Sequence, residues 1–185
     1  MKANSQSNSI RADALAGYCM ESALWKLLLQ IAEFMNNHRP YIVEPADIII
    51  QQDNFMLDDN LTESSEPDAV WNLAATICFI SSGHTVFGQY GRDYQKRNPK
   101  AKLPVLQKEH AALTPIIHKC LVADEEKRIS LAELITLAKK GLDDALKREK
   151  IRQPASENYN SDNNLNLSDI HSAWPEEMID INCSV

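Results

Sequence analysis

The sequence has no long hydrophobic run. Its longest apolar stretch, residues 69–80, has 12 residues and is interrupted by Asn72 and Thr76. Such a segment is too short to cross the hydrocarbon core of a membrane and long enough for a buried helix. Residues 1–9 are polar and have none of the apolar character of a secretory signal. We therefore expect a cytoplasmic protein that does not bind membranes.

Cysteine is scarce, and no two cysteines have CxxC spacing. The four residues are Cys19, Cys78, Cys120 and Cys183, and three of them fall within apolar helical patterns. We predict that they are reduced thiols packed in the core rather than disulfide or metal ligands. The five histidines form no HExxH motif and no zinc-spaced cluster with cysteine, so nothing suggests a metal hydrolase. No cofactor is expected.

Basic residues are nearly absent from residues 151–185. This segment carries one basic side chain against six acidic ones, which gives it a net charge of about -5 of the chain's total -7. The rest of the chain is close to neutral and shows no clustered basic face, so we do not expect nucleic-acid binding. Basic residues do gather in residues 88–104. We interpret that stretch as a solvated loop, with a binding patch as the alternative.

The length of 185 residues and the apolar content of 44% suit one domain with a real core. We predict a disordered leader over residues 1–10, a helical domain over 11–150 and an acidic, largely disordered tail over 151–185. Trp174 and Met178 are apolar residues set among acids in that tail. They predict a helix that binds a partner or folds back onto the domain.

Hydrophobic spacing at three and four residues predicts four helices. The second is apolar on nearly every face and belongs in the middle of the fold. Ser130 and Glu133 form a capping box at the start of the fourth. The predicted helices span residues 21–36, about 68–82 with Gly83 ending the helix, about 107–122, and 130–149.

One small β-hairpin is predicted between the first two helices. Residues 48–50 and 55–57 are short β-prone runs, and the Gln-Gln-Asp-Asn sequence of residues 51–54 separates them. Aspartate and asparagine tolerate the backbone geometry of a tight turn, which favours a hairpin here. The predicted fold class is therefore mainly α with a single small hairpin.

Three kinase-like features, the third a pair of segments, occur in the right order. Residues 24–33 (LWKLLLQIAE) look like the helix before a catalytic loop, and residues 44–50 (EPADIII) stand where that family has K-P-E-N-I-L-I. Residues 70–74 (VWNLA) are similar to D-V-W-S-L-G, and residues 120–131 (CLVADEEKRISL) to C-L-x-x-D-P-x-x-R-P-S. Over about residues 11–145 the chain thus resembles the C-terminal lobe of a eukaryotic-type protein kinase. The resemblance implies a helical lobe, with the N-terminal lobe absent.

When the sequence is aligned with the kinase motifs, it lacks the side chains that phosphoryl transfer requires. The catalytic Asp position falls on Ile42, or on Pro40 in a gapped alignment, and neither side chain accepts a proton. Glu44 replaces the phosphate-facing Lys. Asp47 and Asp59 match metal-ligand positions and are candidates for a vestigial Mg²⁺ site, although a turn and a loop start explain them equally well. No ATP or Mg²⁺ binding is expected.

The resemblance also implies particular structural contacts. Only residues 60–67 separate Asp59 from the central helix, so the activation segment is almost wholly missing. Ala69 occupies the position of the Asp that braces the catalytic loop, unless Asp68 substitutes. Arg128 is kept, and Glu66 or Glu63 is its expected acidic partner.

The leading functional hypothesis is a non-catalytic pseudokinase lobe that works as a protein interaction or regulatory module, similar to kinase non-catalytic C-lobe domains. Removing the N-terminal lobe should leave apolar residues around 15–29 and the hairpin near solvent, so Leu15 and Phe55 are predicted to contact a partner. Trp174 and Met178 in the tail are further candidates. The partner is another protein or a second copy of this chain. The alternatives are a split kinase completed by another chain and a helical domain whose likeness is accidental.

Overall fold

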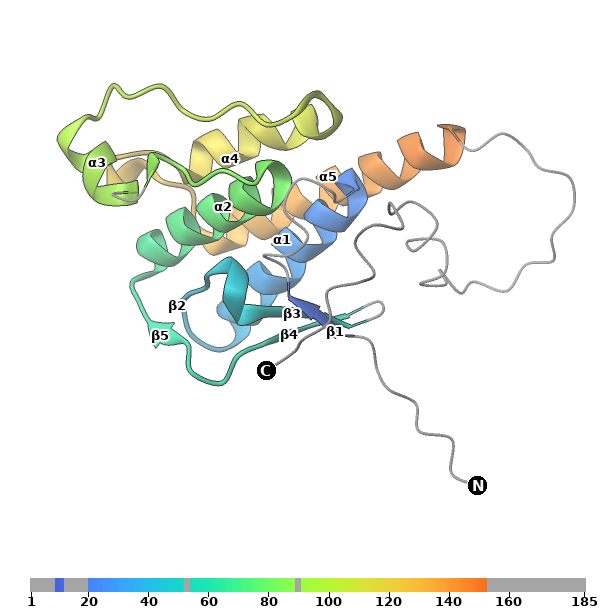
Figure 1. Ribbon diagram of the computed structural model, residues 1–185, viewed down its shortest axis with the longest axis horizontal. Coiled ribbons are helices and arrows are strands. Elements are labelled where there is room, and N and C mark those ends of the chain that lie inside the picture. Colours follow the sequence, from blue (N-terminus) through green and yellow to red (C-terminus); the bar gives the residue numbers. More distant parts are fainter. Residues whose placement is uncertain (1–8, 12–19, 52–53, 89–90, 153–185) are drawn as a thin grey trace, which may run out of the picture.

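The computed structural model describes residues 9–11, 20–51, 54–88 and 91–152 (Figure 1). Within these ranges the fold is mainly helical with two small antiparallel sheets, as the sequence predicts for its fold class. The elements in chain order are β1 (Ser9–Arg11), α1 (Glu21–Asn37), β2 (Tyr41–Ile42), η2 (Pro45–Asp47), β3 (Ile48–Gln51), β4 (Asn54–Leu57), β5 (Thr62–Glu63), α2 (Glu66–Ser82), α3 (Gly91–Arg97), η4 (Lys108–Leu113), α4 (Thr114–Cys120), η5 (Glu125–Lys127) and α5 (Leu131–Arg152), where η denotes a 3₁₀ helix.

The central helix of the fold is α2, which lies between α1, α4 and β2 (Figure 1). Most of its residues are buried, including Leu73 and Ile77, which are fully enclosed. Ser65 caps its start, because its Oγ accepts a hydrogen bond from the Asp68 N–H at 3.3 Å. Gly83 ends it with a φ of 73°, a left-handed conformation that favours glycine. The predicted helix and its central position are confirmed.

Helices α1 and α5 run in opposite directions and form the most extensive helix pair. The start of α1 meets the end of α5: Arg148 Nη2 lies 2.9 Å from the Glu21 carboxylate. Between these ends the two helices approach closely where Gly141 of α5 faces the indole ring of Trp25, which is only 2% exposed. The absence of a side chain at Gly141 makes this close approach possible.

The segment between α2 and α5 differs from its prediction. The stretch predicted as a solvated loop contains the short helix α3, anchored by the buried Gln95. The side chain of Gln95 accepts a hydrogen bond from Trp71 Nε1 at 2.7 Å and donates one to the Leu121 carbonyl. The predicted helix over 107–122 is also broken into η4 and α4. Pro115 lies in the first turn of α4, where a backbone N–H would have no partner within the helix. Because proline has no N–H to donate to the preceding turn, it cannot continue a helix that arrives from η4.

The predicted hairpin is present as β3 and β4, which pair from Ile48 opposite Leu57 to Gln51 opposite Asn54. Two further pairings were not predicted. Strand β1 adds to the outer edge of β3, and its first two residues lie inside the stretch predicted as a disordered leader. Strands β2 and β5 form a separate two-stranded sheet, with Tyr41 opposite Glu63.

Two of the four cysteines lie in the described residues, and both are buried free thiols. Cys78 is on α2 and Cys120 is on α4. Desolvation by burial raises the pKa of each thiol to about 12. These two therefore stay protonated at neutral pH, in agreement with the prediction of core thiols. Cys19 and Cys183 lie outside the described residues.

Candidate functional site

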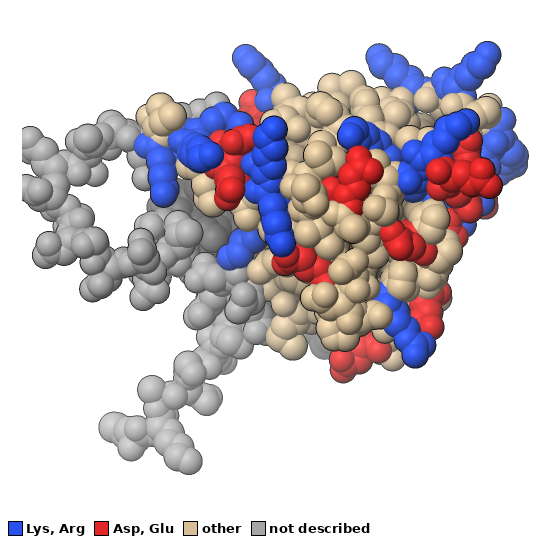
Figure 2. All heavy atoms as spheres, turned by 180° about the vertical axis from the view of Figure 1, so that it is seen from behind, with Lys and Arg blue, Asp and Glu red and all other residues tan. Residues whose placement is uncertain are grey.

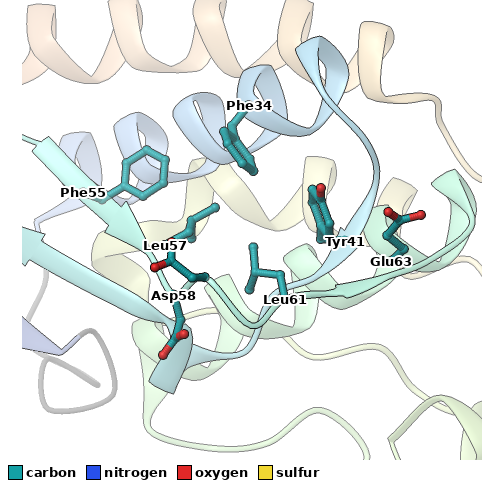
Figure 3. Close-up of a pocket in the computed structure, with 8 residues that line it drawn as sticks. Phe34, Tyr41, Phe55, Leu57, Asp58, Leu61 and Glu63 are labelled. Carbon is teal, nitrogen blue, oxygen red and sulfur yellow. The ribbon is translucent and has the colours of Figure 1, made fainter.

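A pocket of about 510 Å³ lies between the end of α1, the hairpin and the β2–β5 sheet. We refer to it as the aromatic pocket. Figure 3 shows the rings of Phe55, Phe34 and Tyr41 in an arc, with two leucine side chains below them. Its lining residues are three aromatic residues, two leucines and three acids, namely Phe34, Tyr41, Phe55, Leu57, Leu61, Asp58, Asp59 and Glu63.

The aromatic walls of the pocket come from three different elements. Phe34 is on the last turn of α1, and its ring stacks on Tyr41 with 6.1 Å between centroids. The His38 ring also stacks on Phe34, with 4.6 Å between centroids. Strand β4 contributes Phe55, and all three pocket rings are only partly buried. Apolar ring surface therefore remains within reach of solvent at the pocket.

Acidic side chains lie at the margins of the pocket rather than among the rings. Asp58 and Glu63 mark opposite ends in Figure 3. Asp58 Oδ1 accepts hydrogen bonds from the Asn60 backbone N–H at 3.1 Å and from its side-chain amide at 3.2 Å, which fixes the turn after β4. Glu63 forms an ion pair with Arg39 at 2.7 Å. The Asp59 carboxylate is exposed and has no ion pair within the described part of the chain.

The two predicted metal-ligand candidates have different surroundings. Asp47 Oδ2 accepts a hydrogen bond from the Glu44 N–H at 2.8 Å and so caps the turn η2. Asp59 lies at the aromatic pocket. Across residues 9–11, 20–51, 54–88 and 91–152, no group of three or more His, Cys, Asp or Glu side chains is arranged to hold a metal ion. Asp47 thus lies in the turn η2, and Asp59 lies in the turn that follows β4.

The segment at the predicted catalytic-loop position is held by α2 through residues that the sequence did not indicate. Asn72 Oδ1 accepts a hydrogen bond from the Val43 N–H at 2.7 Å, and Thr76 Oγ1 donates one to the Val43 carbonyl at 2.7 Å. The predicted brace, Asp68, instead lies in an ion-pair cluster at the start of α2. Asn72 and Thr76 were visible only as polar interruptions of the apolar run.

Arg128 is a buried cation, and Asp68 is the acid that forms an ion pair with it. Its guanidinium donates to the Val122 carbonyl at 3.0 and 2.8 Å and to the Pro67 carbonyl, and it lies 3.8 Å from the Asp68 carboxylate. Arg92 of α3 forms an ion pair with the same carboxylate. We refer to Asp68, Arg92 and Arg128 as the arginine cluster. It joins the start of α2 to α3 and to the segment that leads into α5.

The expected partners of Arg128 were wrong. Glu66 Oε1 instead accepts a hydrogen bond from the Leu131 N–H at 2.8 Å, which places a carboxylate at the start of α5. An acid there satisfies an otherwise free backbone donor and interacts favourably with the helix dipole. Glu63 pairs with Arg39 at the aromatic pocket.

The arginine cluster predicts an acid-sensitive contribution to stability. Burial raises the pKa of the Asp68 carboxyl, but the hydrogen bond and charge of Arg92 outweigh it, so the pKa lies below its ordinary value of 3.8. Since the folded pKa is lower than the unfolded one, this stabilisation is complete above about pH 4 and is lost as the pH falls through the folded pKa. We expect the melting temperatures of the native protein and Asp68→Asn to differ most near neutral pH and to converge in acid.

The matched control for this experiment is Asp93→Asn, which changes an exposed carboxylate next to Arg92. Its melting temperature should follow that of the native protein at every pH. A difference between the native protein and Asp68→Asn that stays constant down to about pH 2.5 would show that the ionised carboxylate does not stabilise the fold.

The structure places one of the four predicted partner-binding residues at the aromatic pocket. Phe55 lines it, whereas Leu15, Trp174 and Met178 lie outside the described residues. The wider prediction, that the apolar residues around 15–29 lie near solvent, holds for Met20, which is 57% exposed, but is wrong for the leucines described. Leu24, Leu27, Leu28 and Leu29 are buried, because α5 and α2 cover the apolar face of α1.

Sequence reasoning missed most of the pocket. Phe34 continues the helical spacing of Leu27 and Ile31, which was a usable signal, but Leu61 and Glu63 follow no pattern.

Ser81 and His110, which lie 29 residues apart, were also not expected to meet. Ser81 Oγ lies 2.7 Å from His110 Nδ1, and both residues are buried, so this pair joins α2 to η4 away from solvent.

Charges of both signs are interspersed on the face opposite to that of Figure 1 (Figure 2). Several bases in and near α3 and η5 are paired: Lys96 lies 2.8 Å from Glu125, and Lys127 lies 2.8 Å from Asp124. Of the five bases in residues 88–104, Arg92 and Lys96 form ion pairs within the described part of the chain.

No protein-family model and no curated protein matches this sequence. None of the helices in the described ranges has the length and apolar character needed to cross a membrane.

Proposed function

We propose that this chain is a non-catalytic interaction module with the layout of a protein kinase C-terminal lobe, and that a partner protein binds at the aromatic pocket. The observation that carries the proposal is the pocket itself. Three partly exposed rings and two leucines form an apolar surface with polar margins. Concave surfaces with aromatic side chains at the centre and polar groups at the rim are typical of binding sites.

The charge of the pocket supports binding rather than phosphoryl transfer. Its lining contains three carboxylates and no Lys or Arg. Nucleotide phosphates need a cation or a metal ion to offset their charge, and carboxylates alone would repel them. Ile42, at the position of the catalytic base, is an aliphatic residue of β2 paired with Thr62. These features favour the interaction module over a split kinase.

The proposal predicts a partner whose affinity depends on Phe55. The native protein would be used to capture partners from an extract of the source cells, and each candidate would be purified and titrated by calorimetry. Phe55→Ser should weaken binding at least about tenfold, since aromatic anchors dominate interface energies. The matched control is Val105→Ser, which removes another apolar side chain, 70% exposed and outside the pocket. Its affinity should equal that of the native protein.

Nucleotide addition tests the enzymatic alternative directly. A ligand that binds the folded state raises its melting temperature by mass action. We expect no change with millimolar ATP and Mg²⁺. An increase that disappears in Asp59→Ala would contradict the proposal, and so would purified partners that bind Phe55→Ser and the native protein equally.

A further inference from the structure

The strand that supplies Phe55 and Leu57 to the aromatic pocket has an unpaired edge. The sheet order is β1-β3-β4, so β4 is the last strand on its side. Within the described part of the chain, no strand pairs with its outer edge. The edge of a sheet presents backbone donors and acceptors to which another strand can add.

The register of the hairpin shows which backbone groups face outward. The Asp58 N–H donates to the Asp47 carbonyl at 2.9 Å, toward β3. Because backbone groups in an antiparallel strand alternate in direction, Met56 also points toward β3, whereas Phe55 and Leu57 direct their N–H and C=O groups to the outer edge. The same two residues line the pocket with their side chains. A strand added here would therefore lie beside the pocket.

The margin of the pocket next to this edge is acidic. Asp58 and Asp59 follow β4 directly, and neither is ion-paired in the described residues. The aromatic rings beside them present faces to which cations are attracted. A cationic group in the pocket would contact carboxylates and aromatic faces together. The long apolar stem of Arg or Lys could pack against Leu57 and Leu61.

We propose that the partner binds as an extended basic segment, which adds a strand to the outer edge of β4 and places an Arg or Lys side chain in the aromatic pocket. This inference rests on the proposed function, because it specifies the partner for the same pocket. A second copy of this chain would bring the same carboxylates to the interface, and residues 151–185 carry six acids and one base. Charge therefore favours a different, basic chain over both.

The test is selection of binders from a displayed library of random peptides about ten residues long, a length that spans a short edge strand. Selection uses the native protein, with counter-selection against Phe55→Ser. We expect the surviving peptides to carry Arg or Lys among alternating β-branched residues. Alternate backbone nitrogens of the best peptide would then be methylated, either at the odd or at the even positions. Only one of these two sets should abolish binding, because only one edge of the added strand forms hydrogen bonds to β4.

Two variants then test the charge. Asp58→Asn/Asp59→Asn should weaken peptide binding about tenfold and reduce its salt dependence. The control is Asp143→Asn, which changes an exposed acid on α5 and should leave the affinity and its salt dependence unchanged. Circular dichroism of each variant checks that the fold is kept.

The remaining outcomes separate the two proposals. Pocket-dependent peptides that are not basic, or that tolerate methylation at either set of positions, would overturn strand addition while leaving the interaction module intact. If arginine amide binds as tightly as the peptide, strand addition is also overturned, because the pocket would then recognise a small cation without an added strand. If counter-selection against Phe55→Ser removes every peptide that binds the native protein, both proposals are overturned.

Discussion

Replacing Arg128 with methionine is expected to lower the free energy of unfolding by about 3–5 kcal/mol, the usual cost of breaking a buried charge network. The Arg128 side chain has no exposed surface and donates to the Val122 and Pro67 carbonyls. Methionine keeps much of the apolar stem and removes every donor, which leaves these partly buried carbonyls without the hydrogen bonds of the guanidinium. It also removes one of the two arginines beside Asp68.

Urea unfolding followed by circular dichroism measures this effect, with Lys127→Met as the matched control. Lys127 is the neighbouring cation, with a side chain 76% exposed and paired to Asp124 on the surface. Its replacement should leave the unfolding midpoint unchanged, because exposed ion pairs contribute little. Arg128→Lys should fall between the native protein and Arg128→Met, since one ammonium group cannot reproduce the planar set of donors. Equal midpoints for Lys127→Met and Arg128→Met would refute a structural role for the buried guanidinium.

The helices that the sequence predicted well are those whose stability comes from an apolar face. Helix α1 has a regular stripe of buried residues and α2 is apolar nearly all round, so spacing alone identified both. Helix α3 was missed because Gln95 is its only buried residue. The hydrogen bonds that anchor it reach Trp71 and Leu121, which lie 24 and 26 residues away. No local pattern records contacts of that kind.

The candidate site was predictable only in part, for a similar reason. Phe55 and Asp59 were identified from the hairpin and from the kinase-like motif beside it. Tyr41 and Glu63 reach the pocket through the pairing of β2 with β5, which are two residues long and too short to show alternation. The partner of Arg128 was misassigned because Asp68, rather than Glu66, turns toward the guanidinium at the start of α2.

Gly141 in α5 was also not singled out, although a lone glycine inside a helical pattern often has a packing reason. A Cβ atom at this position would lie 2.5 Å from Trp25 Cη2 and 2.6 Å from Cζ2 and Cζ3. Real side chains do not approach so closely, and the indole is enclosed, with 2% exposure. The glycine therefore sets how closely α1 and α5 can pack.

Gly141→Ala is accordingly expected to destabilise the protein by about 2 kcal/mol, which corresponds to a fall in melting temperature of about 4–8 °C. Helix propensity alone predicts the opposite sign, because alanine stabilises a helix by about 1 kcal/mol relative to glycine. The sign of the change therefore decides between close packing and intrinsic propensity. Differential scanning calorimetry gives the answer, and Lys140→Ala, at an exposed position one residue earlier, should change stability by less than about 0.5 kcal/mol.

A double-mutant cycle with Trp25→Phe tests whether the indole ring is the cause. Phenylalanine is smaller and lacks the outer indole atoms, so Trp25→Phe alone should destabilise the protein by leaving a cavity. In that background the added methyl group of Gly141→Ala has room, and alanine should be neutral or stabilising by up to about 1 kcal/mol. The two substitutions are thus expected to be strongly non-additive. If Gly141→Ala costs the same in both backgrounds, Trp25 does not determine the need for glycine, and the close approach of α1 to α5 would have to depend on other residues.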